Sequence, residues 1–257
     1  MSNLFIISEF GVIILLGLPT IAYLYIAYRP GFKQIACLSE TLANYNLFNS
    51  LYSIFLGMAL VTLLVNFNTV QDDTRKEAES IISLARLMSG MSEGQELKQA
   101  LVNYSASVVA YDLAAIQAGV MSEQASAAFD LLWLNAYKTR VATKNDESIH
   151  QLIMAELSTI TKCRMTRRMK CKENLHAFVF TLIVVGYYVM LIKSYITRVS
   201  CKRAQFVLDS TMFLMILMVI TAIVDLNTPF VGIVNVDTSP FQWALERATL
   251  ITKLTPN

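Results

Sequence analysis

The residues best suited to chemistry in this sequence form a basic run two thirds of the way along the chain. Six basic residues fall within eleven positions, uninterrupted by any acidic residue: Lys162, Arg164, Arg167, Arg168, Lys170 and Lys172. At 100° per residue they point to all sides of a helix. Such a ring beside an apolar segment attracts lipid headgroups, by about 1 kcal/mol per residue near the surface, or small anions at a pore mouth. An ordinary juxtamembrane anchor would have the same composition.

Other candidates for chemistry are weak. Neither His150 nor His176 has a Cys or carboxylate at a spacing typical of metal sites. No nucleophile elbow, P-loop, HExxH or dinucleotide fingerprint occurs, so we expect no enzyme activity, metal or cofactor. A nucleic-acid partner is not expected either, because the basic run lacks interleaved aromatic residues. The four cysteines form no CxxC pair, which favours reduced thiols: Cys37, Cys163, Cys171 and Cys201.

The elements that position these residues are mainly apolar. Of the 257 residues, 55% are hydrophobic and 16% charged, against about 45–50% and 25% in soluble domains. About 20 apolar residues in a helix cross a bilayer, which predicts a multi-pass membrane protein. Lys193 can extend the third, shorter span by snorkelling. The four predicted spans are Leu4–Tyr28, Leu47–Phe67, Ala177–Ile192 and Phe206–Val224.

Residues 68–176 between the second and third spans have another composition, with 13 basic and 13 acidic residues. Apolar residues recur there at three- and four-residue steps, which predicts a soluble bundle of four antiparallel helices. The first helix continues the second span without a break. Ser122 is expected to cap the helix that begins at Glu123, and Asp146 to cap the last one.

The predicted fold is therefore all-α, with transmembrane helices at 1–67 and 177–224, a soluble helical insert at 68–176 and a tail at 225–257. In the tail, Asp225–Gly232 is expected to be irregular and Val231–Val236 short and extended. Ser239 followed by Pro240 resembles an N-cap before a helix over Phe241–Thr252.

One face of the second span is a candidate for function. Its apolar residues occupy a sector of about 100°, interrupted by a single hydroxyl. Periodicity does not choose between helix packing, lipid contact and an apolar constriction in a channel, because the whole segment is apolar. The residues that would line a pore are Ser50, Ile54, Met58, Val61 and Val65.

Two stretches carry a resemblance to a known family. Ser53–Gly57 (SIFLG) followed by Val61–Val65 (VTLLV) is similar to S-F-V-L-G and V-T-L-V-V in the second helix of the bestrophins, ligand-gated anion channels. Asp225, Pro229, Phe230 and Gly232 match the D-x-P-F-x-G segment of the bestrophin-like bacterial membrane proteins, and an amphipathic helix follows in both. The order of spans, insert and tail is also similar.

The resemblance implies a pentamer whose second helices line the pore, with Ile54 and Met58 at its neck and Ser50 one turn earlier. It also implies an insert and termini in the cytoplasm, which the balanced loop charges leave open. The chain departs from the bestrophins where Ile54 and Met58 replace neck aromatics and Asn66–Thr69 replaces an Arg and Trp pair. Only Asp237 stands near the position of their calcium-binding acidic cluster, so calcium gating is not expected.

Two functions remain open on the sequence. The first is a homo-oligomeric channel for small anions such as chloride. The second is a non-conducting membrane scaffold or sensor whose helical insert binds a partner or ligand. They differ in the surroundings of the second helix, which faces a water-filled axis in the first and protein or lipid in the second.

Overall fold

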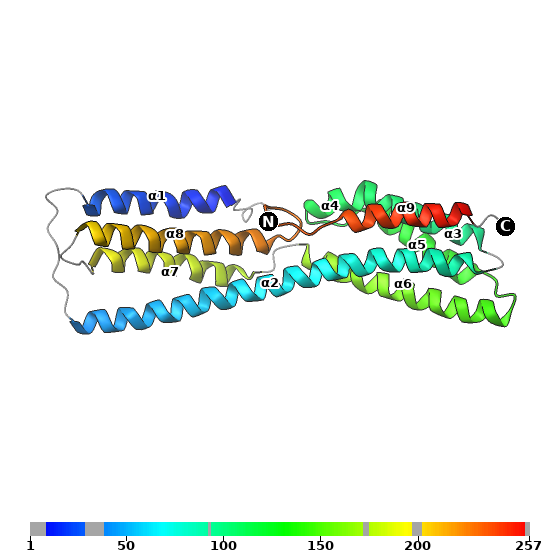
Figure 1. Ribbon diagram of the computed structural model, residues 1–257, viewed down its shortest axis with the longest axis horizontal. Helices are drawn as coiled ribbons and strands as arrows, with labels where there is room; N and C mark the ends of the chain where they lie inside the picture. Colours follow the sequence, from blue (N-terminus) through cyan, green and yellow to red (C-terminus); the bar gives the residue numbers. More distant parts are fainter. Residues whose placement is uncertain (1–8, 29–38, 92–93, 172–174, 197–201, 255–257) are drawn as a thin grey trace. The chain divides into compact units, whose positions relative to one another are not determined.

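The computed structural model describes residues 9–28, 39–91, 94–171, 175–196 and 202–254 (Figure 1). These residues are almost all helical and contain no strand, which confirms the all-α prediction. The chain divides into two compact units, considered separately below. The first comprises residues 1–65 and 173–227, and the second comprises residues 66–172 and 228–257. Helix α2 (Ser39–Ser89) contributes to both units.

Within the described residues, four helices are long and apolar enough to cross a membrane. They are α1 (Glu9–Tyr28), α2, α7 (Ala177–Ile196) and α8 (Lys202–Asn227). A helix satisfies its backbone hydrogen bonds internally, as hydrocarbon requires. The predicted spans fall within these helices, although Leu4 lies outside the described residues. The irregular stretch expected from Asp225 begins only at Thr228, because α8 runs to Asn227 and includes Asp225.

In the first unit, polar contacts on α1 compensate for Pro19. Proline has no N–H, so the carbonyl of Leu15, four residues earlier, loses its helical partner. The hydroxyl of Tyr188 on α7 donates to this carbonyl at 3.0 Å. One residue further on, Thr20 Oγ1 donates to the Leu16 carbonyl at 2.7 Å and also contacts the Tyr187 hydroxyl. The carbonyl that Pro19 leaves without a helical partner therefore helps to join α1 to α7.

A carboxylate joins α1 to α8. Asp209 Oδ2 accepts hydrogen bonds from the hydroxyl groups of Tyr28, at 2.8 Å, and Tyr23, at 3.2 Å. Tyr23 also lies 3.0 Å from Ser194 Oγ on α7. Polar groups inside an apolar bundle are costly unless they are hydrogen-bonded, so these contacts favour one arrangement of the three helices.

The contact between α2 and α7 depends on a glycine. Tyr52 on α2 is buried and its hydroxyl donates to the Ile183 carbonyl at 2.8 Å. A Cβ added at Gly186 would lie 2.2 Å from Tyr52 Cε2, closer than any side chain allows. The tyrosine ring therefore lies directly against the α7 backbone at Gly186.

The second unit is a helical bundle around one apolar core. It contains the rest of α2, α3 (Gln95–Ser107), the π-helix η1 (Val108–Asp112), α4 (Leu113–Gln117), α5 (Glu123–Lys138), α6 (Lys144–Lys170) and α9 (Ser239–Leu254). The core includes residues of α2, α3, α5, α6 and α9. The tail helix, predicted as a separate segment, thus belongs to this bundle through Phe241, Ala244 and Ala248.

The helix caps agree only partly with expectation. Ser122 caps α5 as predicted, since its Oγ accepts a hydrogen bond from the Ala125 N–H. The predicted cap at Asp146 is wrong, because Thr143 caps α6 and Asp146 completes a capping box from the third helical position. Helix α9 begins at Ser239 itself, whose N–H and Oγ donate to the carboxylate of Asp237.

Substitution at Gly186 tests the close contact in the first unit. We expect Gly186→Ala to lower the free energy of unfolding by about 1–3 kcal/mol, because the added methyl group overlaps the Tyr52 ring. The measurement is the thermal midpoint of the detergent-solubilised protein. Gly17→Ala and Gly57→Ala are matched helical controls with no atom within 4 Å of the added Cβ. Equal midpoints for all three variants would contradict the expectation.

Candidate functional site

The predicted pore-lining residues form an exposed stripe on α2. Ile54 and Met58 are 60% and 67% exposed on the single chain. Ser50, Val61 and Val65 are exposed as well. The residues by which α2 packs into the first unit are a different set, namely Tyr52, Leu56, Ala59 and Leu63.

These two faces of α2 lie on opposite sides of the helix. At 100° per residue, the centre of the exposed stripe lies about 180° from the centre of the packed face. The exposed stripe is therefore separate from the face by which α2 packs into the first unit. It remains available to lipid, to water or to another copy of the chain.

The basic run divides into two groups in the structure. Lys162 and Arg168 are exposed, and Lys170 is half-buried with its Nζ 3.4 Å from Asn66 Oδ1. Lys172 lies outside the described residues. Arg164 and Arg167 are instead buried in the second unit, 6% and 1% exposed. A ring of charge on a helix that packs on one side necessarily places some members inward, so these two do not present charge to anions or headgroups.

Arg167 is the centre of a buried ion-pair cluster. Its Nη2 lies 3.1 Å from Glu77 Oε1 on α2 and 2.9 Å from Asp112 Oδ2 on η1. Both carboxylates are fully buried. Its guanidinium also lies over the ring of Phe241 on α9, 5.0 Å from the centroid. One side chain thus contacts three other elements of the bundle.

Arg164 and Tyr104 complete the cluster. Tyr104 donates to Glu77 Oε1 at 2.6 Å and accepts from Arg164 Nη1 at 3.1 Å. Arg164 also lies over the Phe129 ring, 4.9 Å from its centroid. Burial and the neighbouring Glu77 carboxylate raise the pKa of Tyr104 well above its ordinary value, so its hydroxyl stays protonated as a donor. Two arginines against two carboxylates leave the cluster electrically balanced.

The π-helix places Asp112 in this cluster. The backbone N–H of Leu113 bonds to the carbonyl of Val108, five residues earlier. In a regular α-helix, four residues cover about 400°, so side chains four apart point in directions that differ by about 40°. The wider π turn contains an extra residue and reduces this difference. Tyr104, Val108 and Asp112 are consequently all fully buried. The second Asp112 oxygen, Oδ1, accepts from the Ser122 N–H at 3.0 Å and fixes the start of α5.

The ion-pair cluster was not predicted from the sequence, although the sequence carries one signal for it. Leu97, Leu101, Tyr104, Val108 and Ile116 make one apolar stripe, and Asp112 falls midway between its last two members. A carboxylate on an apolar stripe indicates a buried partner of opposite charge. Its partner could not be named, because Arg167 is 55 residues away in the sequence.

The residues of the tail motif belong to both units. Asp225 is buried in the last turn of α8, whereas Pro229 and Phe230 are buried in the second unit. Gly232 is exposed at a φ of 125°, a conformation that favours glycine. The predicted extended segment Val231–Val236 is wrong, because this segment is a loop in which the Val236 N–H bonds to the Pro229 carbonyl at 2.8 Å.

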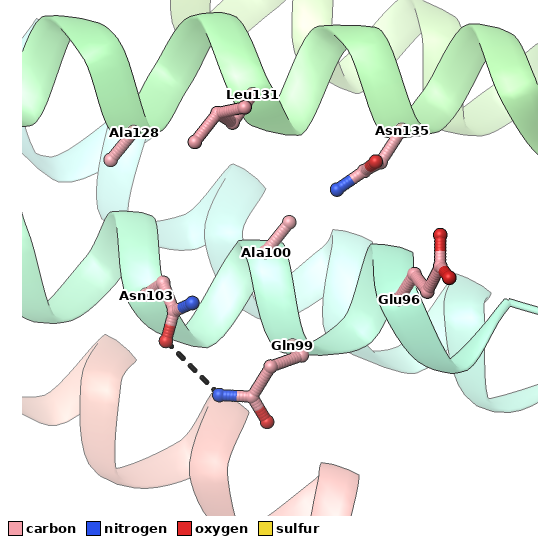
Figure 2. Close-up of a pocket in the computed structure, with 7 residues that line it drawn as sticks. All are labelled: Glu96, Gln99, Ala100, Asn103, Ala128, Leu131 and Asn135. Atoms are coloured by element: carbon pink, nitrogen blue, oxygen red, sulfur yellow. Dashed lines mark hydrogen bonds between the residues drawn. The ribbon is translucent and has the colours of Figure 1, made fainter.

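A groove of about 340 Å³ lies between α3 and α5 (Figure 2). Figure 2 shows the small side chains of Ala100 and Ala128 between the two helices, with Gln99 donating to Asn103 at 3.0 Å. Glu96 and Asn135 supply its other polar groups. The residues that line it include no basic side chain.

Comparison with known proteins decides the family. The Bestrophin-like domain matches residues 44–241, which is more than three quarters of the sequence. The chain belongs to the Bestrophin-like family. This confirms the resemblance seen in the sequence, and the matched region includes both the α2 stripe and the tail motif.

Solved structures show the same fold. The crystal structure of a bacterial Bestrophin homolog from Klebsiella pneumoniae, carrying a mutation, is similar with a TM-score of 0.68 at 13% identity, over 95% of this chain and 99% of the other. The crystal structure of a membrane protein is similar with a TM-score of 0.69 at 14% identity, over 95% and 98%. No curated protein matches the chain in sequence. The Bestrophin-like fold is therefore retained at very low identity.

The ion-pair cluster predicts that substitutions of two adjacent arginines, Arg167 and Arg168, change the stability of the protein by unequal amounts. We expect Arg167→Met to lower the free energy of unfolding by about 3–5 kcal/mol, because it leaves Glu77 and Asp112 buried without their cation. Urea unfolding followed by circular dichroism measures the loss. Arg168→Met is the matched control, since Arg168 is exposed and its loss should change stability by less than about 0.5 kcal/mol. Comparable losses in the two variants would show that burial of Arg167 is not what stabilises the bundle.

Proposed function

We propose that this Bestrophin-like chain is a homo-oligomeric anion channel in which α2 lines the pore. The observation that carries the proposal is the position of the α2 stripe. Ser50, Ile54, Met58, Val61 and Val65 face away from the chain's own helices. Members of the family are anion channels, so an exposed stripe on this helix is suited to line an anion pore.

Several copies are needed to make the pore. The stripe lies on the outside of one chain, so only neighbouring copies can enclose it around an axis. The resemblance to bestrophins favours five copies. In this arrangement Ile54 and Met58 form an apolar neck one turn apart, where anions pass with part of their hydration removed.

The exposed basic residues of the second unit have a secondary role in the proposal. Lys162 and Arg168 raise the local concentration of anions or bind headgroups at the bilayer surface. Lys172 is proposed to act with them. We further propose that the insert and both termini are cytoplasmic and that the protein lies in the inner membrane, as the resemblance implies.

Chloride flux from liposomes tests the proposal. We expect the purified, reconstituted protein to release chloride, and Ile54→Ala and Met58→Ala to raise the rate, because each widens an apolar neck. The measurement is chloride efflux under an imposed gradient, with the oligomer verified by size-exclusion chromatography before reconstitution.

Two substitutions elsewhere in the first unit serve as matched controls. Ile14→Ala on α1 and Met218→Ala on α8 remove side chains of the same types at 58% and 60% exposure. They should leave the flux unchanged. Equal effects of all four substitutions would contradict an α2 pore. An intact oligomer without any flux would overturn conduction itself and favour the non-conducting scaffold or sensor.

A further inference from the structure

The loop after the last apolar helix has an unusual exposed tip. Its side chains at Val231, Ile233 and Val234 are 48%, 81% and 47% exposed. The residues on either side, Phe230 and Val236, are buried in the second unit. An apolar tip is thus held out of the bundle by two anchors at its base.

The loop is also fixed in shape. The Val231 N–H donates to the Thr228 carbonyl at 3.0 Å, and the Thr228 hydroxyl donates to the Val231 carbonyl at 3.2 Å. The Val236 N–H closes the base by donating to the Pro229 carbonyl. Gly232, with a φ of 125°, allows the turn at the tip. A tip that is already ordered loses little conformational entropy when it binds.

The chain keeps this tip close to the end of an apolar helix. Asn227 is the last residue of α8, and its Oδ1 accepts from the Leu175 N–H at 2.6 Å, just before α7 begins. The start of α7 and the end of α8, two of the four candidate spans, therefore lie next to each other. Ile233 follows Asn227 by six residues, so it lies at most about 21 Å from the end of α8 even if the chain were fully extended.

The composition of the loop also suits a position near the bilayer surface. No Asp, Glu, Lys or Arg occurs from residue 226 to residue 236. Three branched apolar side chains on a protruding turn expose surface that water solvates poorly.

We infer that the tip Val231–Val234 inserts into the interfacial region of the bilayer, on the side where α8 ends. Val231, Ile233 and Val234 enter the boundary between headgroups and acyl chains, where apolar side chains typically reach a depth of about 5–10 Å. The tip then acts as a lipid anchor beside the last span. This contact does not depend on whether the protein conducts anions.

Quenching of an introduced tryptophan by brominated lipid tests the inference. The background is the full chain with Trp133→Phe and Trp243→Phe, carrying either Ile233→Trp or, as a second tip variant, Val234→Trp. In vesicles of phosphatidylcholine brominated near the top of the acyl chains, we expect either variant to lose at least about half of its emission, as suits an interfacial depth.

Val141→Trp is the matched control. Val141 is 43% exposed in the segment between α5 and α6. The 27 residues of α6 place it about 40 Å from Cys171, which lies two residues before the chain re-enters the first unit with its apolar helices. Its emission should be quenched by aqueous iodide and not by the brominated lipid. Iodide quenching of both tip variants would overturn the inference. Shielding of both from iodide and brominated lipid would also overturn it and assign the tip to contact with a second copy.

Discussion

A guanidinium that is shielded from water is costly to bury without opposite charge, and Arg167 obtains that charge at its Nη2 from two carboxylates on different helices. Its partners Glu77 and Asp112 lie on α2 and η1, and Phe241 of α9 covers its face. Removing either carboxylate would leave an uncompensated buried charge, which is more costly than losing an ordinary contact. The bundle therefore has one favourable arrangement of these elements. The π-helix is part of that requirement, because it turns Asp112 toward the arginine.

Helix α2 has a different role in each unit. In the first unit it packs through Tyr52 against the α7 backbone at Gly186 and leaves its opposite face exposed. In the second unit it contributes Glu77 and core residues such as Ile81 and Leu84. The proposed pore stripe and the buried ion-pair cluster consequently belong to one uninterrupted helix of 51 residues. In the proposed channel, substitutions in either part would alter the same element.

The tail also serves two environments. Asp225 completes the last turn of α8, whereas Phe230 and Val236 fix the loop to the second unit. The exposed apolar side chains of Val231, Ile233 and Val234 lie between these two buried residues.

The sequence by itself determined the features that depend on local composition. Four long apolar segments are sufficient to predict four membrane helices, because hydrocarbon permits few other backbone arrangements. The stripe on α2, the N-cap at Ser122 and the family resemblance were likewise read from residues close together in the chain. Charge alone did not show which residues of the basic run would be buried, since all six are basic residues of one short helical segment.

The tertiary structure decided that question through partners distant in sequence. Arg167 and Glu77 are 90 residues apart, and Asp112 reaches them only because of a π turn that the sequence did not predict. The tail helix joined the second unit for a similar reason, because Phe241 covers a cation that local periodicity does not reveal. Apolar length is a property of a segment, whereas charge compensation is a property of the assembled bundle. The sequence therefore predicted the membrane helices, and only the packed structure showed which charges lie inside.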